Sequence, residues 1–493
     1  MLDTPTTDLK ARLSDPSLLE TRAWIDGAWI GADSGATFDV INPSRGDVIA
    51  QVADLGRAET ARAIAAAEPA QKAWAALSAK ERSVVLKRWN ALMLENAEDL
   101  AVILTAEMGK PLAEARGEIG YGASFIEWFA EEAKRVYGET VPGHMSDKRV
   151  TVIRQPVGIA GAITPWNFPN AMITRKAAPA LAAGCAFIVK PAEDTPLSAI
   201  AMGVLAERAG IPGGVFQVVP SIDGPAIGQE FCENPAMRKL SFTGSTEVGR
   251  ILLRQAADQV MTCSMELGGN APFIVFDDAD LDAAVVGAMA CKYRNAGQTC
   301  VCANRIYVQS GVYDAFAEKL AAAVAQLKVG DGFGDGVTIG PLINQDAVAK
   351  VEQHLSDAKG KGATVIAGGA PDALGGTFFE PTLVSNVTQD MLIAREETFG
   401  PVAPLFRFET EEEAIAMSND TEFGLAAYFF ARDIGRITRV SEALEYGIIG
   451  VNSGIISAES VPFGGVKQSG LGREGGRQGI EEYLETKYIC LSV

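Results

Sequence analysis

The chain has 493 residues, of which 48% are apolar, and a formal net charge of −19 from 43 basic and 62 acidic side chains. This length indicates two or three domains with large cores, and the apolar content excludes a disordered chain. The acidic balance argues against nucleic acid or an anionic membrane as the main partner, although such a charge also simply keeps a large protein soluble.

The N-terminal third is predicted to be mostly helical after a short hairpin. Residues 24–30 are predicted to form two strands joined at Asp26-Gly27, a dipeptide typical of tight hairpin turns. Helices are expected over residues 58–76, after the capping-box pair Ser78 and Glu81, and over about 111–137.

Strand and helix patterns alternate from residue 157 onward. The expected strands are residues 157–163, 186–189, 215–219 and 239–243, and the expected helices are 171–183 and 197–209. This alternation predicts an α/β fold with a parallel, doubly wound sheet, on which ligands bind beyond the carboxyl ends of the strands. A second α/β segment begins near residues 272–276 and continues to about residue 460.

Two of the strand ends carry residues suited to a dinucleotide. Gly244 and Ser245 stand where a helix begins, and its free N–H groups favour a pyrophosphate, although a plain N-cap explains them equally well. Gly244 and Gly249 are five residues apart, so this is not the G-x-G-x-x-G pattern. Glu193 would accept hydrogen bonds from a ribose and repel a 2′-phosphate; alternatively, Lys190 and Glu193 form a solvated turn.

Two further strand ends carry polar residues suited to catalysis. Prolines fix the loop of residues 164–169, so the amide of Asn167 is a candidate donor to a developing oxyanion, or part of a purely structural loop. Glu266 precedes Gly268 and Gly269, which allow close approach of another group. A buried Glu266 with a raised pKa would act as a general base, whereas an exposed turn glutamate is the alternative.

Cys300 stands in a glycine-containing turn just before a strand-like run at residues 306–308. A thiol displayed in this way is suited to attack a carbonyl carbon. The chain has only two histidines, His144 and His354, and neither lies near another catalytic motif in the sequence. We therefore expect a carboxylate to handle the protons, because a Cys-His mechanism lacks its base.

The seven cysteines are odd in number and scattered, which predicts a reducing compartment and no disulfide framework. Residues 1–21 are polar and show no secretory signal, and the longest apolar run, residues 177–189, is too short to span a bilayer. We expect a cytoplasmic protein with no membrane partner and no metal site.

Seven motifs in chain order resemble the aldehyde dehydrogenase superfamily over nearly the whole chain. They lie at residues 164–169, 190–193, 242–249, 266–270, 297–300, 396–401 and 462–465. The resemblance implies three parts: a Rossmann-like parallel-sheet NAD(P)-binding domain, an α/β catalytic domain and a small β oligomerisation element. Their expected ranges are 1–137 with 158–265, then 266–460, and 138–157 with 480–493.

The resemblance also implies roles for individual residues. Cys300 would be the nucleophile, Glu266 the base, and Asn167 with the Cys300 N–H the oxyanion site. The residues that would bind the cofactor are Trp166, Lys190, Glu193, Gly244, Ser245, Glu397 and Phe399. The implied reaction passes from a thiohemiacetal on Cys300 to a thioester, which water activated by Glu266 then hydrolyses.

Three segments, residues 170–176, 295–305 and 467–475, look like the succinate-semialdehyde dehydrogenase branch of this superfamily. In that branch Arg175 and Arg294 match the positions that hold the distal carboxylate of the substrate, and Ser457 matches a hydroxyl donor. Arginine suits this task because its planar fork binds a carboxylate bidentately, although surface or interdomain ion pairs are the alternative. Glutarate semialdehyde stays open, because one methylene is worth only about 1–3 kcal/mol.

Cys302 matches a second cysteine that forms a reversible disulfide with the nucleophile in that branch. Residues two apart make a strained bridge unless the loop rearranges, and a small buried filler is the alternative. Glu193 favours NAD, whereas some members of the branch use NADP, which Lys190 would tolerate.

The resemblance implies a homodimer or a homotetramer. A non-catalytic relative would be expected to lose Cys300, Glu266 or Asn167, and none is lost. A coenzyme A-acylating relative would commonly lack the base that Glu266 provides.

Overall fold

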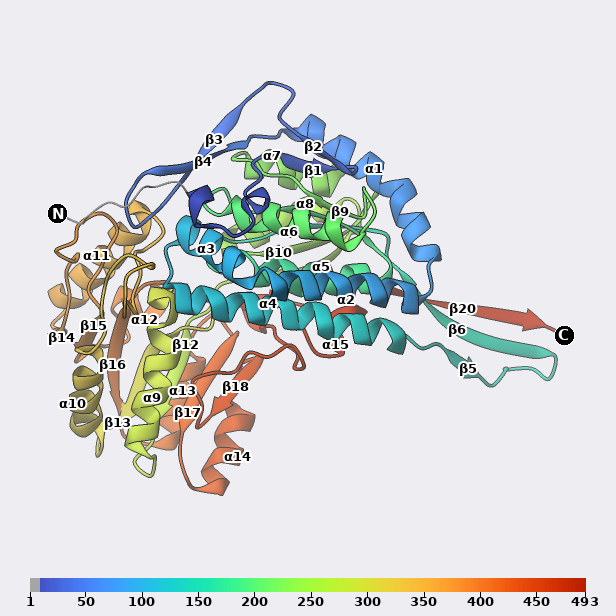
Figure 1. Cartoon of the computed structure of the whole chain (residues 1–493). Coiled ribbons are helices and arrows are strands. Elements are labelled where there is room, and N and C mark those ends of the chain that lie inside the picture. The colour runs from blue at the N-terminus through green and yellow to red at the C-terminus, as the bar shows by residue number, and fades with distance from the viewer. Residues whose placement is uncertain (1–8) are drawn as a thin grey trace.

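A computed structural model describes residues 9–493 (Figure 1). Its largest sheet has eight strands in the order β19-β11-β10-β7-β8-β9-β1-β2. The bounds are β1 (Ala23–Ile25), β2 (Ala28–Ile30), β7 (Ile159–Ile163), β8 (Ala186–Lys190), β9 (Phe216–Val218), β10 (Met237–Thr243), β11 (Thr262–Glu266) and β19 (Gly470–Leu471). The five central strands run parallel, which confirms the predicted doubly wound sheet, and the outer strands pair antiparallel.

Helices cover both faces of this sheet. Those bounds are α1 (Arg57–Ala76), α2 (Ala79–Glu95), α3 (Ala97–Met108), α4 (Leu112–Glu132), α5 (Ala171–Ala183), α6 (Pro196–Ala209), α7 (Gly224–Glu233) and α8 (Thr246–Ala257). Alternate strand residues point to opposite faces. Phe187 and Val189 of β8 therefore join the core under α2–α6, whereas Ala186 and Ile188 join the core under α1, α7 and α8.

The structure confirms the predicted hairpin and capping box, and it shifts the end of one predicted helix. Trp24 pairs with Trp29 across the predicted hairpin, and Asp26 and Gly27 both have positive φ, as its two-residue turn requires. The Ser78–Glu81 capping box forms at the start of α2. The helix predicted to reach residue 137 ends at Glu132 and continues only as a short 3-10 turn, Ala133–Arg135, because the chain then leaves for a separate sheet.

A second sheet has seven strands in the order β14-β15-β16-β13-β12-β17-β18 and its own core. The bounds are β12 (Ala271–Val275), β13 (Ala303–Gln309), β14 (Thr364–Ala367), β15 (Thr382–Ser385), β16 (Val402–Phe408), β17 (Ala426–Phe430) and β18 (Ile448–Val451). Its helices are α9 (Leu281–Lys292), α10 (Tyr313–Val324), α11 (Gln345–Gly360), α12 (Leu392–Arg395), α13 (Glu411–Asn419) and α14 (Ile434–Ala443). All pairings except β14 with β15 are parallel, so the second α/β segment is confirmed.

A third sheet, β20-β6-β5, extends away from the body as an arm (Figure 1). It consists of β5 (Glu139–Val141), β6 (Lys148–Pro156) and β20 (Leu484–Ser492), which follows α15 (Gln478–Glu481). A smaller hairpin joins β3 (Thr37–Ile41) to β4 (Val48–Ala53). Within residues 9–493 no helix is long and apolar enough to cross a membrane. The exact domain limits stay a prediction.

Candidate active site

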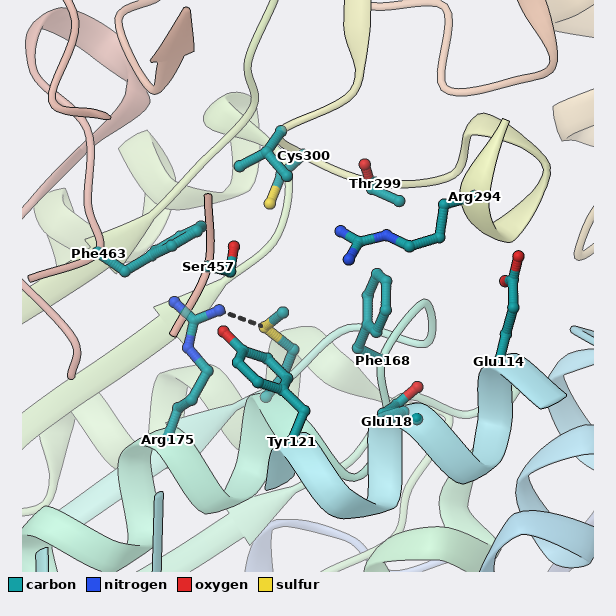
Figure 2. Close-up of a pocket in the computed structure, with 13 residues that line it drawn as sticks. Glu114, Glu118, Tyr121, Phe168, Arg175, Arg294, Thr299, Cys300, Ser457 and Phe463 are labelled. Carbon is teal, nitrogen blue, oxygen red and sulfur yellow. Dashed lines mark hydrogen bonds between the residues drawn. The ribbon is translucent and has the colours of Figure 1, made fainter. Parts of the chain in front are cut away.

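Cys300 lies where two cavities meet. One, here called the arginine cavity, has a volume of about 270 Å³ and is lined by Arg175, Arg294 and Ser457 among others (Figure 2). The other, here called the glycine cavity, has a volume of about 360 Å³ and contains Gly244 and Gly268. Cys300 lines both cavities, and its sulfur points into the arginine cavity in Figure 2. A group bound in either cavity therefore reaches the same thiol.

The loop before Cys300 is held in an unusual conformation. Within the 3-10 turn η4 (Arg294–Gly297), Asn295 and Ala296 both have a φ of 53°, a region that L-residues rarely adopt. The Glu114 carboxylate of α4 accepts from the Asn295 N–H at 2.8 Å, and the Asn295 amide donates to the Asn167 carbonyl at 3.1 Å. These buried bonds stabilise a backbone that is strained by itself.

Gly297 completes this turn for a steric reason. Its φ is 76°, and a Cβ there would stand 2.2 Å from the Gly400 carbonyl oxygen. No other residue fits, so the close approach of residues 297 and 400 requires the glycine.

The Cys300 thiol is in its neutral form in this environment. Burial raises the pKa of Cys300 to about 12, and the nearby Arg175 charge acts in the opposite direction. Because the thiolate is the nucleophilic form, attack on a carbonyl requires a group that removes this proton.

Glu266 ends β11 and is only 4% exposed, so the alternative of an exposed turn glutamate is wrong. Burial raises the pKa of Glu266 well above its usual value, and the charge of Glu474 adds to this effect. Its Oε2 atom is buried without a hydrogen-bond partner among residues 9–493. Glu266 is therefore the buried, weakly acidic carboxyl that the sequence predicts.

Asn167 follows β7 and is buried, with both main-chain and side-chain groups engaged. Its side-chain nitrogen donates to the Gln298 carbonyl at 3.0 Å, and its carbonyl accepts from Lys110 Nζ at 2.7 Å. An amide nitrogen carries two hydrogens, so one remains for another acceptor. These contacts tie Asn167 to the Cys300 loop.

Arg175 and Arg294 enter the arginine cavity from different elements, α5 and η4, and Ser457 enters from the segment after β18 (Figure 2). Arg175 is buried, packs its guanidinium 3.9 Å from the Phe463 ring centre and pairs with Glu474 at 2.8 Å. The alternative of a surface ion pair is therefore wrong for Arg175, whereas that of an ion pair between distant parts of the chain describes its contact with Glu474. The cavity gathers the three residues predicted to hold a carboxylate.

The glycine cavity gathers five of the seven predicted cofactor residues. They are Trp166, Gly244, Ser245, Glu397 and Phe399. Ser245 caps α8 by accepting from the Val248 N–H, so the positive end of this helix faces the cavity. A pyrophosphate fits this arrangement, because the first-turn N–H groups of a helix lack internal partners.

Glu397 contacts the backbone beside the glycine cavity. It accepts from the Gly269 N–H at 3.1 Å, and burial raises its pKa to about 7. Trp166 contacts Phe399 edge to face, with ring centres 5.6 Å apart.

Lys190 and Glu193 lie outside the lining of both cavities. They follow β8 and form an ion pair at 2.7 Å, in which the Lys190 side chain is buried and that of Glu193 is half exposed. The alternative of a fully solvated turn is wrong for Lys190.

Cys302 is fully buried and lines neither cavity. Its sulfur lies 3.2 Å from Lys292 Nζ, and all seven cysteines are free thiols. A bond between Cys300 and Cys302 therefore requires the loop to rearrange, whereas the alternative of a buried filler describes the present position.

The sequence analysis missed part of the site. Glu114, Glu118 and Tyr121 of α4 line the arginine cavity, and their spacing of four and three residues places them on one helix face. This spacing is the sequence signal from which the three residues could have been predicted. His354 is distant from every motif in the sequence, but its ring contacts Thr398 and Glu396 of the 396–401 motif in the fold.

The family model described as "Aldehyde dehydrogenase family" matches residues 29–489 of the chain. This match spans both α/β sheets, the arm and the cysteine between the two cavities. The chain belongs to the aldehyde dehydrogenase family, whose enzymes oxidise aldehydes with NAD(P).

Particular relatives are similar over their whole length. The chain is 62% identical to the glutarate-semialdehyde dehydrogenase of Pseudomonas aeruginosa, covering 97% of this chain and 99% of that protein. It is 61% identical to the succinate-semialdehyde dehydrogenase [NADP(+)] GabD of Escherichia coli, covering 98% and 100%. The crystal structure of succinate-semialdehyde dehydrogenase from Burkholderia pseudomallei matches with a TM-score of 0.97 at 61% identity, covering 98% and 100%.

Proposed function

We propose that this aldehyde dehydrogenase oxidises succinate semialdehyde to succinate. The observation that carries the proposal is the convergence of Arg175 and Arg294 in a cavity that Cys300 also lines. A semialdehyde has a carboxylate at one end and an aldehyde at the other. Guanidinium groups suit the carboxylate, and the thiol suits the aldehyde.

In the proposed mechanism the Cys300 thiol gives its proton to Glu266 or to water, and the thiolate attacks the aldehyde carbon to form a thiohemiacetal. The Asn167 amide and the Cys300 N–H donate hydrogen bonds to the oxyanion and stabilise its negative charge. The nicotinamide cofactor, when bound, supplies the acceptor for the hydride that leaves this carbon. Glu266 then removes a proton from water, and the water hydrolyses the Cys300 thioester.

Glutarate semialdehyde is the second candidate substrate, because a relative of 62% identity carries that name. It has the same two ends and one more methylene. The coenzyme A-acylating and non-catalytic alternatives lack support, because Glu266 is present and buried beside the site. Formation of an acyl-coenzyme A product would overturn the hydrolytic mechanism.

Steady-state formation of reduced cofactor tests the proposed function. Succinate semialdehyde, glutarate semialdehyde and butanal are compared with NAD and with NADP. A kcat/KM at least about tenfold higher for a semialdehyde than for butanal supports it. Equal values would show that the arginines do not select the substrate.

For the cofactor we propose that Lys190 and Glu193 decide between NAD and NADP. The name of the Escherichia coli relative specifies NADP(+), so it does not support the preference for NAD that Glu193 suggested. A turn of the half-exposed Glu193 side chain away from Lys190 would break their ion pair and leave the Lys190 charge for a 2′-phosphate.

We also propose that the enzyme is a homodimer or homotetramer joined through the arm, and that it works in the reducing cytoplasm. Apolar side chains exposed on the arm support the first proposal; they are Val141, Tyr488, Ile489 and Leu491. Seven free thiols support the second. Disulfide formation between Cys300 and Cys302, with peroxide as the two-electron oxidant, would be a regulatory step that requires Cys302 to leave Lys292.

A further inference from the structure

Tyr121 points its hydroxyl group into the arginine cavity from α4. Figure 2 shows the ring between the Arg175 and Phe168 side chains, with the hydroxyl close to the Arg175 guanidinium and below Ser457. The hydroxyl oxygen is buried, makes no hydrogen bond of good geometry among residues 9–493, and has the Ser457 hydroxyl group as a close polar neighbour. A buried polar group without a partner is costly, so this group is suited to a ligand or to water in the cavity.

The position of Tyr121 is fixed by packing. Its ring meets Phe125 edge to face with centres 5.0 Å apart. One residue further, Gly122 allows α4 to approach α5, because a Cβ there would stand 2.2 Å from Asn170 Oδ1. The close contact of α4 and α5 therefore brings the Tyr121 hydroxyl group to the same cavity as Arg175.

The charged groups near Tyr121 include two arginines and the Glu474 carboxylate. Burial raises the pKa of Tyr121, and the nearby Arg175 and Arg294 charges oppose this effect. The phenol is therefore protonated at neutral pH, in the form that donates a hydrogen bond.

The Arg175 charge alone does not explain binding of an acid. Its guanidinium already pairs with Glu474 at 2.8 Å, so part of its charge is neutralised within the protein. Other donors must then complete the shell of a carboxylate, which accepts about four hydrogen bonds. Tyr121, Ser457 and Arg294 are the groups placed to do so.

We propose that the Tyr121 hydroxyl group donates a hydrogen bond to the distal acid group of the substrate and so helps to select acidic aldehydes over uncharged ones. This inference rests on the proposed function, because it assumes that the arginine cavity receives the acid end. It adds a specificity residue from α4 to those on α5, η4 and the segment after β18.

The test is Tyr121→Phe, which removes only the hydroxyl oxygen. For the proposed semialdehyde we expect a fall in kcat/KM of about 10- to 100-fold, carried mainly by KM. For butanal we expect no change, because it has no acid group to lose a partner. Thermal stabilisation by succinate alone should weaken in the same variant, which gives a readout apart from catalysis.

The matched control is Tyr137→Phe, which removes the same oxygen from a tyrosine that is 73% exposed and outside the arginine cavity. It should behave as wild type. If Tyr121→Phe keeps the wild-type ratio of semialdehyde to butanal, the inference is wrong. If it lowers both substrates equally, Tyr121 has a structural role and the inference is also wrong.

The two proposals fail in different ways. A wild-type enzyme that shows no preference for the semialdehyde overturns the proposed function, whatever the variant does. A wild-type enzyme with that preference, together with an unchanged Tyr121→Phe variant, overturns the role of Tyr121 alone.

Discussion

At the residue scale, the central feature is a buried thiol group and a buried carboxyl group, whose charged forms burial disfavours. Burial raises the pKa of both Cys300 and Glu266, and the charge of Arg175 opposes the rise in each. Neither group is reactive in its resting form at low pH. Their chemistry therefore depends on the transfer of protons out of the site.

We predict that breakdown of the Cys300 thioester accelerates as pH rises through the region above 4.5, the usual pKa of a glutamate. Below the raised pKa, Glu266 holds a proton and cannot accept one from water; above it, the carboxylate can. Single-turnover breakdown of the acyl-enzyme measures this step. Glu266→Gln should lose the dependence, and a variant that kept it would contradict the role of Glu266.

The second prediction at this scale concerns Glu193. Replacement by serine removes the carboxylate and frees Lys190, with which it pairs at 2.7 Å. We expect Glu193→Ser to raise the ratio of kcat/KM for NADP to that for NAD by about tenfold, because the repulsion of a 2′-phosphate disappears. Glu412→Ser, at an exposed position on α13 of the second sheet, is the control. An unchanged ratio would show that the pair does not decide the cofactor.

At the scale of elements, α4 supports the loop that carries Cys300. Glu114 accepts from the N–H of Asn295, one of the two residues with left-handed backbone. Glu118 accepts from the N–H groups of Asn170 and Ala171 at the start of α5. One helix therefore positions both the Cys300 loop and the segment after Asn167.

We predict that Glu114→Leu lowers kcat by about tenfold or more for semialdehyde and butanal alike, because an unsatisfied Asn295 N–H costs about 1–3 kcal/mol in this strained turn. Glu114→Gln keeps an accepting oxygen and should retain most activity. Steady-state kinetics on both substrates separates this positioning role from substrate selection. A loss confined to the semialdehyde would contradict it.

Sequence periodicity predicted the elements well where local and tertiary preferences agree. Helix α5 has the predicted bounds, because Gly184 adopts the left-handed φ of 104° that ends a helix. The loop before Cys300 was recognised from its residue types and not from any periodic pattern. Its left-handed Asn295-Ala296 pair depends on Glu114, which is distant in the chain, and no local pattern shows that contact.

At the scale of the whole molecule, two α/β sheets meet around one thiol and an arm extends beyond them. The predicted sheets were readable from alternating strands and helices. The convergence of the two cavities at Cys300 was not, because it depends on how α4, α5, η4 and the segment after β18 pack. Most of the site residues predicted from the sequence line the two cavities, but Tyr121 was not among the predicted residues.

We predict that the arm joins subunits. Its strand β20 exposes Ile489 and Leu491, 48% and 56% exposed, although such side chains favour burial. Replacing both by lysine should shift the protein to a smaller species in light scattering coupled to size exclusion. Val286→Lys, at a 70% exposed site on α9, is the control. An unchanged mass would place the interface elsewhere.

The most direct test of the account is intact-protein and peptide mass spectrometry of Glu266→Gln after one turnover with succinate semialdehyde and cofactor. Without its base the variant should hold the thioester, so we predict one succinyl group on the peptide that contains Cys300, and none in Cys300→Ser. A succinyl group on another residue, or cofactor reduction by the variant with no adduct at any time, would contradict a mechanism through Cys300 and Glu266.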